Sequence, residues 1–114
     1  MSIEEYRFGH ITIDGREYDH DVIVFPQRVR ADWWRKEGHR LDVADLDEVF
    51  QDPPEVLVIG TGYFGNMAVS KATLALLHER GIETRVLRTG EAVAEINRLQ
   101  HELARVVGAL HLTC

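Results

Sequence analysis

The residues whose type and spacing could do chemistry stand in one short loop. The segment Gly60-Thr61-Gly62-Tyr63-Phe64-Gly65 fits the pattern G-x-G-x-x-G, whose small residues let a backbone approach a bound phosphate closely. At the start of a helix, such a loop supplies amide donors and about half a positive charge. Arg88 ends the next expected strand, where it suits contact with a 2′-phosphate. The pattern indicates a cleft for a small anion or a nucleotide.

A structural interpretation of the same loop stays open beside the chemical one. A complete dinucleotide-binding fold needs two mononucleotide halves, and this chain has one short run of that kind. Tyr63 and Phe64 also place bulk inside the loop. On this interpretation the glycines serve a strand-to-helix turn that needs small residues for steric reasons. The candidate ligand-binding residues are Gly60, Thr61, Gly62, Gly65, Arg88 and Asn97.

Catalytic and metal-binding patterns are not predicted. The chain has six histidines, and no pair has the spacing of H-E-x-x-H or another close ligand frame. In the segment Asp19-His20-Asp21, a strand would turn the two acids one way and the histidine the other, so the three would not converge. Ser70 lies in an expected helix without a nucleophile elbow around it. We therefore assign no catalytic residue, no metal ligand and no cofactor.

A second candidate surface combines aromatic and acidic residues. Trp33 and Trp34 are adjacent, so in a strand one ring faces the core and the other faces outward. The stretch from Asp42 to Glu55 carries six acids and no base, which suits a solvated face or a docking surface for a basic partner. The candidate partner-binding residues are Trp33, Trp34, Asp45, Asp47 and Glu48.

Composition limits the class of protein that these residues belong to. A chain of 114 residues with 45% hydrophobic and 28% charged residues is expected to form one domain, residues 1–114. Its net charge of -6 at pH 7 argues against binding to nucleic acid, and no apolar run is long enough for a membrane helix. One cysteine and no export signal favour the cytoplasm. A homo-oligomer is not excluded.

The first half reads as strands with one short helix. Phe8, Ile11 and Ile13 suit a strand, and Asp14-Gly15 is a tight-turn signal. The returning strand is expected over 16–25, and a third extended segment over 29–34. Asp45 suits the N-cap of a short helix that Pro53-Pro54 would end. The fold class that follows has an antiparallel β layer at the N-terminus.

The second half reads β-α-β-α-β, which implies parallel strands joined by crossovers. The strands are expected at 56–59, 82–87 and 106–112. Asn66 is expected to cap a helix over 67–80, and Thr89 to cap a second one with the apolar stripe Ala92, Ile96, Leu99 and Leu103. The predicted architecture is therefore α/β: a mixed sheet with helices packed on it, beside the N-terminal antiparallel layer.

Several of these segments together resemble the small Mth-type domain, a family of largely uncharacterised proteins. The resemblance rests on Ile11-Thr12-Ile13, the region of Trp34 and His39, Val58-Ile59-Gly60-Thr61-Gly62, and the helix and tail after Thr89. Relatives of that family include a mitochondrial assembly factor of respiratory complex I and an adipogenesis-associated protein. The chain departs from the family at Tyr63-Phe64, at Glu95-Ile96 and at Leu103-Ala104, where a Gly-Arg is usual.

The resemblance implies a mixed α/β domain without an agreed enzymatic activity. Together with the lack of a coherent catalytic set, it favours a soluble, non-catalytic accessory, assembly or binding domain with a protein partner. The alternative is a small-anion or nucleotide-binding protein, and possibly an enzyme, that uses the loop from Gly60 to Gly65. The two differ in one structural feature: an anion site needs free amides of residues 61–66 in an open cleft.

Overall fold

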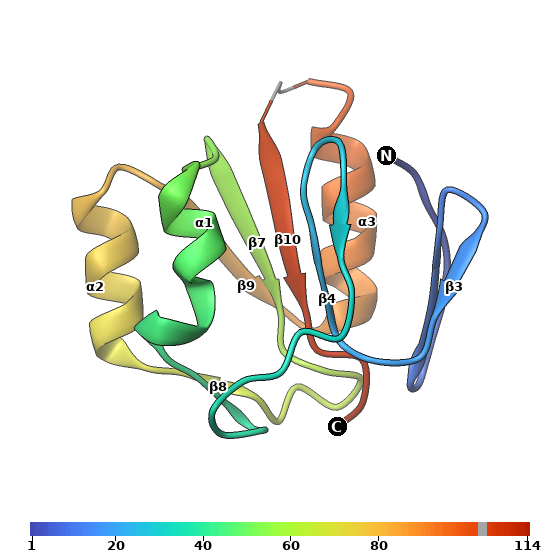
Figure 1. Ribbon diagram of the computed structural model, residues 1–114, viewed down its shortest axis with the longest axis horizontal. Coiled ribbons are helices and arrows are strands. Elements are labelled where there is room, and N and C mark those ends of the chain that lie inside the picture. The colour runs from blue at the N-terminus through green and yellow to red at the C-terminus, as the bar shows by residue number, and fades with distance from the viewer. Residues whose placement is uncertain (103–104) are drawn as a thin grey trace.

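The computed structural model describes residues 1–102 and 105–114, and its centre is a mixed sheet of five strands in the order β5-β4-β10-β7-β9 (Figure 1). These strands are β4 (Val22–Val24), β5 (Val29–Arg30), β7 (Val56–Gly60), β9 (Glu83–Leu87) and β10 (Val106–Leu110). Strands β9, β7 and β10 are parallel, whereas β4 pairs antiparallel with β10, and β5 pairs antiparallel with β4. The predicted β-α-β-α-β half and the mixed sheet are confirmed.

Helices cover both faces of this sheet. Helix α3 (Thr89–Leu99) lies on one face, and α1 (Asp47–Gln51) and α2 (Lys71–Glu79) lie on the other (Figure 1). Alternate residues of β7 therefore enter different cores: Val56 and Val58 pack with α3, whereas Leu57 and Ile59 pack with the buried residues of α1 and α2. This two-sided burial explains why β7 is an unbroken apolar run.

A separate antiparallel sheet of three strands stands beside α3 (Figure 1). It consists of β1 (Ile3–Arg7), β2 (His10–Ile13) and β3 (Arg16–Tyr18). The predicted tight turn joins β2 to β3, with φ of 49° at Asp14 and 80° at Gly15. Ile3, Ile11 and Ile13 of this sheet complete the core under α3. The predicted N-terminal antiparallel layer is thus confirmed.

Two segments expected to be single strands are divided in the structure. The expected strand 16–25 forms β3 in one sheet and β4 in the other, because the side chains of Asp19 and Asp21 between them bind histidines elsewhere. The expected segment 29–34 pairs only over β5. The chain then turns at Asp32, where φ is 50°, and this turn directs Trp33 into the core.

Both helix starts in the middle of the chain were predicted wrongly. Asn66 was expected to cap a helix, but α2 begins at Lys71 and Ser70 caps it, accepting the Thr73 amide at 3.1 Å. The intervening β8 (Ala68–Val69) pairs with β6 (Arg40–Leu41), and this pairing removes those residues from the helix. Asp45 is not an N-cap: it is the third residue of a 3-10 helix, η1 (Val43–Leu46), which follows Asp42.

Ala92, Ile96 and Leu99 form the buried stripe of α3 as predicted, while Leu103 lies outside the described residues. No described helix has the length and apolar character needed to cross a membrane.

Candidate functional site

The candidate site lies at the carboxyl ends of the three parallel strands. Strand β7 ends at Gly60, β9 at Leu87 and β10 at Leu110. The connection from β7 through α2 places β9 on one side of β7, and the connection through α3 places β10 on the other. The ends of β7 and β10 therefore form a topological switch point, which is where open α/β sheets usually bind ligands. The sequence-predicted loop starts at this point.

The backbone amides of the glycine loop donate hydrogen bonds to acceptors within the protein itself. The amide of Thr61 donates to Leu87 O at 2.8 Å, and that of Tyr63 donates to Thr113 O at 2.7 Å. The Gly65 amide bonds within the loop, and the Asn66 amide donates to Cys114 O at 2.9 Å. Carbonyl oxygens of the segment 113–114 thus occupy the place that a bound anion would take in a phosphate loop.

One further amide of the loop is satisfied by a buried hydroxyl. Thr89 was expected to cap α3, but it is the first helical residue and its side chain turns toward the loop. Its Oγ1 accepts the Gly62 amide at 2.8 Å and donates to His111 O at 2.6 Å. Among the described residues, Phe64 is the only one from 61 to 66 whose amide has no protein acceptor. Thr89 therefore ties the loop to the end of β10.

Steric contacts explain the first two glycines. A Cβ at Gly60 would lie 2.8 Å from both Leu110 Cδ2 and Thr89 Oγ1. A Cβ at Gly62, where φ is +111°, would lie 2.4 Å from the carbonyl carbon of Cys114. Gly60 thus makes room for Leu110 and Thr89, and Gly62 makes room for the segment 113–114, which is the steric role that the structural interpretation of the loop gives to its glycines.

The other predicted ligand-binding residues do not converge with the loop amides. The exposed Arg88 guanidinium donates to Tyr63 O at 2.7 Å and so covers the outside of the loop. Thr61 is buried, and its hydroxyl donates to Leu87 O at 3.1 Å. Asn97 lies more than two turns along α3, where its Oδ1 accepts the Ile3 amide at 3.1 Å and its Nδ2 donates to Ile3 O at 2.8 Å. Asn97 thereby fastens β1 to α3.

The predicted partner surface is also largely occupied by internal contacts. The Trp33 ring is buried and its Nε1 donates to Asp45 O at 3.0 Å, whereas Trp34 is 71% exposed, so the two rings do face opposite ways. The Asp45 carboxylate accepts the amides of Lys36 and Asp42. Glu48 pairs with two arginines, Arg28 and Arg30. Of the five predicted residues, Trp34 and Asp47 remain exposed.

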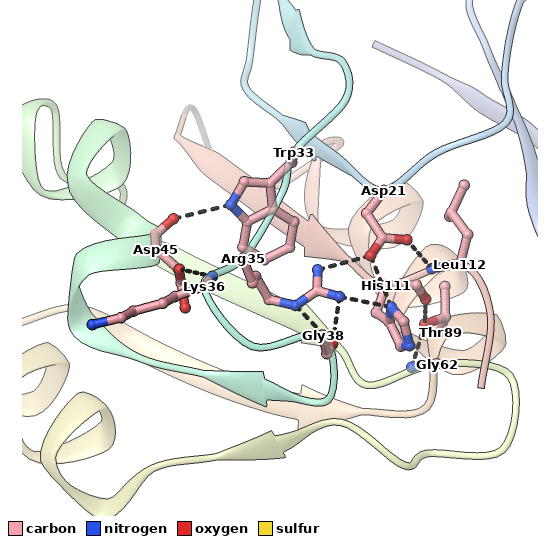
Figure 2. Close-up of polar contacts among 10 residues, drawn as sticks. All are labelled: Asp21, Trp33, Arg35, Lys36, Gly38, Asp45, Gly62, Thr89, His111 and Leu112. Atoms are coloured by element: carbon pink, nitrogen blue, oxygen red, sulfur yellow. Dashed lines mark hydrogen bonds and ion pairs between the residues drawn. The ribbon is translucent and has the colours of Figure 1, made fainter.

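A buried polar cluster that sequence reasoning missed lies beside the loop (Figure 2). It consists of Asp21, Arg35 and His111, and their side chains are 13%, 4% and 5% exposed. Asp21 Oδ2 lies 2.8 Å from both Arg35 Nη1 and His111 Nδ1, and Asp21 Oδ1 accepts the Leu112 amide at 2.7 Å. Arg35 also donates from Nε and Nη2 to Gly38 O.

The surroundings of Asp21 hold it in the ionised form. Burial raises the pKa of Asp21, but the hydrogen bonds with His111 and Leu112 and the charge of Arg35 together lower it by more than burial raises it. The pKa of Asp21 therefore lies below its usual value. His111 Nδ1 lies 2.8 Å from Asp21 Oδ2, which can only accept, and 3.0 Å from Arg35 Nη2, which can only donate. His111 Nε2 is buried and has no partner among the described residues.

This cluster lines a pocket of about 320 Å³. Its wall includes the exposed Trp34, whose ring lies 5.1 Å from that of His20, and His39, whose ring meets that of His111 edge-on at 5.7 Å. Within the described residues, no group of three His, Cys, Asp or Glu side chains is placed to hold a metal ion. The pocket thus offers aromatic faces and single polar atoms rather than a ligand cage.

Two side chains of the loop and one from the turn between β1 and β2 form an exposed aromatic patch, which we define as Phe8, Tyr63 and Phe64. Their exposed fractions are 49%, 45% and 61%. The ring of Phe8 lies 5.9 Å from Tyr63 and 6.1 Å from Phe64, and the last two rings are 5.1 Å apart. The bulk that stands inside the glycine pattern is thus directed to solvent, where a rigid backbone holds it.

Comparison with known proteins places this fold in a family. A family model described as a protein of unknown function, DUF498/DUF598, matches residues 3–111. The chain therefore belongs to the DUF498/DUF598 family. A conserved hypothetical protein from Pyrococcus horikoshii OT3 is 30% identical over 100% of both chains, with a TM-score of 0.85.

Two further solved structures share this fold. A protein named MT938 is 28% identical over 99% of this chain and 98% of its own, with a TM-score of 0.82. A Bordetella pertussis protein described as a Mth938-like domain is 24% identical over 97% of this chain and 85% of its own, and shares the fold at a TM-score of 0.72. The predicted resemblance to the Mth-type domain is confirmed at the level of the family.

Proposed function

We propose that this chain is a non-catalytic accessory domain that docks onto a protein partner through the aromatic patch. The observation that carries the proposal is the contact among three large aromatic side chains that are each about half exposed or more. Aromatic residues supply much of the binding energy at protein interfaces, and they bind best when they are held in place before binding.

The structure of the loop supports such preorganisation. The amide of Tyr63 and the amides on both sides of the Tyr63-Phe64 pair are bonded to backbone or to the Thr89 hydroxyl, so the two side chains stand on a fixed base. Arg88, on the carbonyl of Tyr63, adds an exposed cation at the edge of the patch. The partner that fits is a protein with an apolar depression bordered by carboxylates.

The role in assembly is part of the same proposal. It is supported by the resemblance to a family that includes a complex I assembly factor. It is also supported by the hydrogen bonds at the switch point, where the loop amides and the Thr89 hydroxyl bind other groups of the protein and not a ligand. A cytoplasmic location belongs to the proposal as well, since the one cysteine, Cys114, is a free thiol.

The alternative function, binding of a small anion or nucleotide, would require the segment 113–114 to leave the loop. Its carbonyl oxygens hold the amides of Tyr63 and Asn66. Melting the protein with saturating NADPH or phosphate tests this alternative, because a ligand at 100 times its dissociation constant adds about 2.7 kcal/mol, or roughly 10 °C. We expect no shift; a shift that Arg88→Ala removes would favour the alternative.

Co-purification from cells of the source organism tests the docking proposal. We expect the double variant Tyr63→Ser/Phe64→Ser to lose a partner that the unchanged protein retains. The matched control is Leu74→Ser/Val86→Ser, which removes two side chains that are 38% and 43% exposed on α2 and β9. Loss in both variants, or in neither, would contradict docking by the patch.

A further inference from the structure

Four flat rings line the pocket beside the buried polar cluster: those of His20, Trp34, His39 and His111. They form two contacting pairs. The ring centroids of His20 and Trp34 are 5.1 Å apart, and those of His39 and His111 are 5.7 Å apart. The cavity holds about 320 Å³, which is at the lower end of the range for small-ligand sites. The pocket is therefore large enough for a small planar molecule.

The charged side chains of this wall are already bound within the protein (Figure 2). The carboxylate of Asp19 lies 3.0 Å from His10 Nδ1. The carboxylate of Asp21 lies 2.8 Å from Arg35 Nη1, and the Arg35 guanidinium also donates from Nε and Nη2 to Gly38 O. A charged ligand would find a counter-ion here only by displacing one of these partners, and breaking a buried ion pair is costly. The wall therefore favours a ligand without a net charge.

Trp34 supplies an open ring surface to the pocket, because it is 71% exposed. Its neighbour Trp33 is buried and donates its backbone amide to Asp21 O at 2.8 Å, which fixes the chain at this point. A flat ring stacked on the indole would remove apolar surface from water on both partners. Aromatic pairs prefer centroid separations of about 4.5–7 Å, and both existing ring pairs lie in that range. A ligand ring can therefore extend the contacts that are already present.

We infer that this pocket binds a small planar ring without a net charge, stacked on the indole of Trp34. The ligand class is an uncharged aromatic or heteroaromatic molecule, such as an aromatic carboxamide. This inference is independent of docking by the aromatic patch, because it uses none of the residues of that patch.

A titration followed by NMR of the Trp34 indole N–H tests the inference with four probes of similar size: benzamide, cyclohexanecarboxamide, benzamidinium and benzoate. Cyclohexanecarboxamide keeps the amide but lacks the flat ring, whereas benzamidinium and benzoate keep the ring and carry opposite charges. We expect saturable shifts with benzamide, binding about three-fold weaker or more for cyclohexanecarboxamide, and weaker binding of both ions. Equal binding of cyclohexanecarboxamide would overturn stacking. Equal or tighter binding of either ion, or no saturable shift with benzamide, would overturn the site as inferred.

Variants at exposed residues keep the test independent of folding, with the backbone amide of Thr113, which borders the pocket, as the reporter. Trp34→Ala is expected to weaken benzamide binding about three- to ten-fold, and Trp34→Phe should restore most of it. His20→Ala is expected to weaken it about two-fold. The matched control is His78→Ala, which removes the same ring from an exposed position on α2. An unchanged affinity of Trp34→Ala, or the same affinity for the two histidine variants, would overturn the site.

Discussion

Replacing Gly62 by alanine tests directly how the glycine loop is built. The new Cβ would lie 2.4 Å from the carbonyl carbon of Cys114 and 2.7 Å from Thr113 O. Backbone atoms cannot rotate away as a side chain does, so the segment 113–114 must move. The backbone of residue 62, with φ at +111°, would also be strained with any side chain.

The magnitude follows from these two effects. A residue other than glycine in this φ region costs roughly 1–3 kcal/mol. Displacing the segment 113–114 also weakens the bonds from the Tyr63 and Asn66 amides, and each is worth about 1 kcal/mol. The expected loss is about 3 kcal/mol in the free energy of unfolding. For a domain of this size, the melting temperature should fall by roughly 12 °C.

Circular dichroism during heating measures this change, and Gly90→Ala is the matched control. Gly90 lies in the first turn of α3, and a Cβ there meets no atom within 4 Å. Because alanine is the better helix former, Gly90→Ala should raise stability by about 0.5–1 kcal/mol. The two Gly→Ala changes should thus act in opposite directions. If Gly62→Ala melted with the unchanged protein, the loop could not be packed against residues 113–114.

Three further predictions concern the buried polar groups. Asp21→Asn should cost about 3 kcal/mol in the free energy of unfolding because it leaves Arg35 buried without its partner. Since the pKa of Asp21 is lowered in the folded protein, the stability that Asp21 adds is complete above about pH 4 and is lost as the pH falls through the folded-state pKa. The stability of the variant, measured by urea denaturation, should therefore fall less steeply in acid. Thr89→Val should cost about 2 kcal/mol in urea denaturation, because it removes two buried hydrogen bonds, and an unchanged midpoint would contradict the bridge from Gly62 to β10. Burial raises the pKa of Tyr6 to about 12, so ultraviolet titration should show a tyrosine ionisation step near pH 12 that Tyr6→Phe removes. The stability contributed by neutral Tyr6 should be complete below about pH 10 and be lost as the pH rises toward 12.

Much of the fold follows from local patterns in the sequence. The apolar run at β7 and the stripe of Ala92, Ile96 and Leu99 identify their elements because burial on two faces or on one leaves a clear period. The start of α2 could not be predicted in the same way. Ala68 and Val69 suit a helix, but pairing with β6, a contact distant in sequence, takes them into a strand.

The site was harder to predict than the fold because its partners are far apart in the chain. Asp21 and His111 are 90 residues apart, and the spacing of their types gives no motif. One signal was present: Asp19-His20-Asp21 interrupts an apolar strand, and acids at that place need partners. The glycine pattern lies at the topological switch point of the sheet, but the acceptors of its amides belong to the chain itself.

Site-specific photo-crosslinking tests the docking proposal most directly. A photoreactive phenylalanine analogue is placed at Phe64, 61% exposed in the patch, or at Leu74, 38% exposed on α2, and expressed in cells of the source organism. We predict one discrete crosslinked species at Phe64 that contains a different protein, and none at Leu74. Crosslinks only to a second copy of this chain, the same products from both positions, or no product at Phe64 would contradict the proposed function.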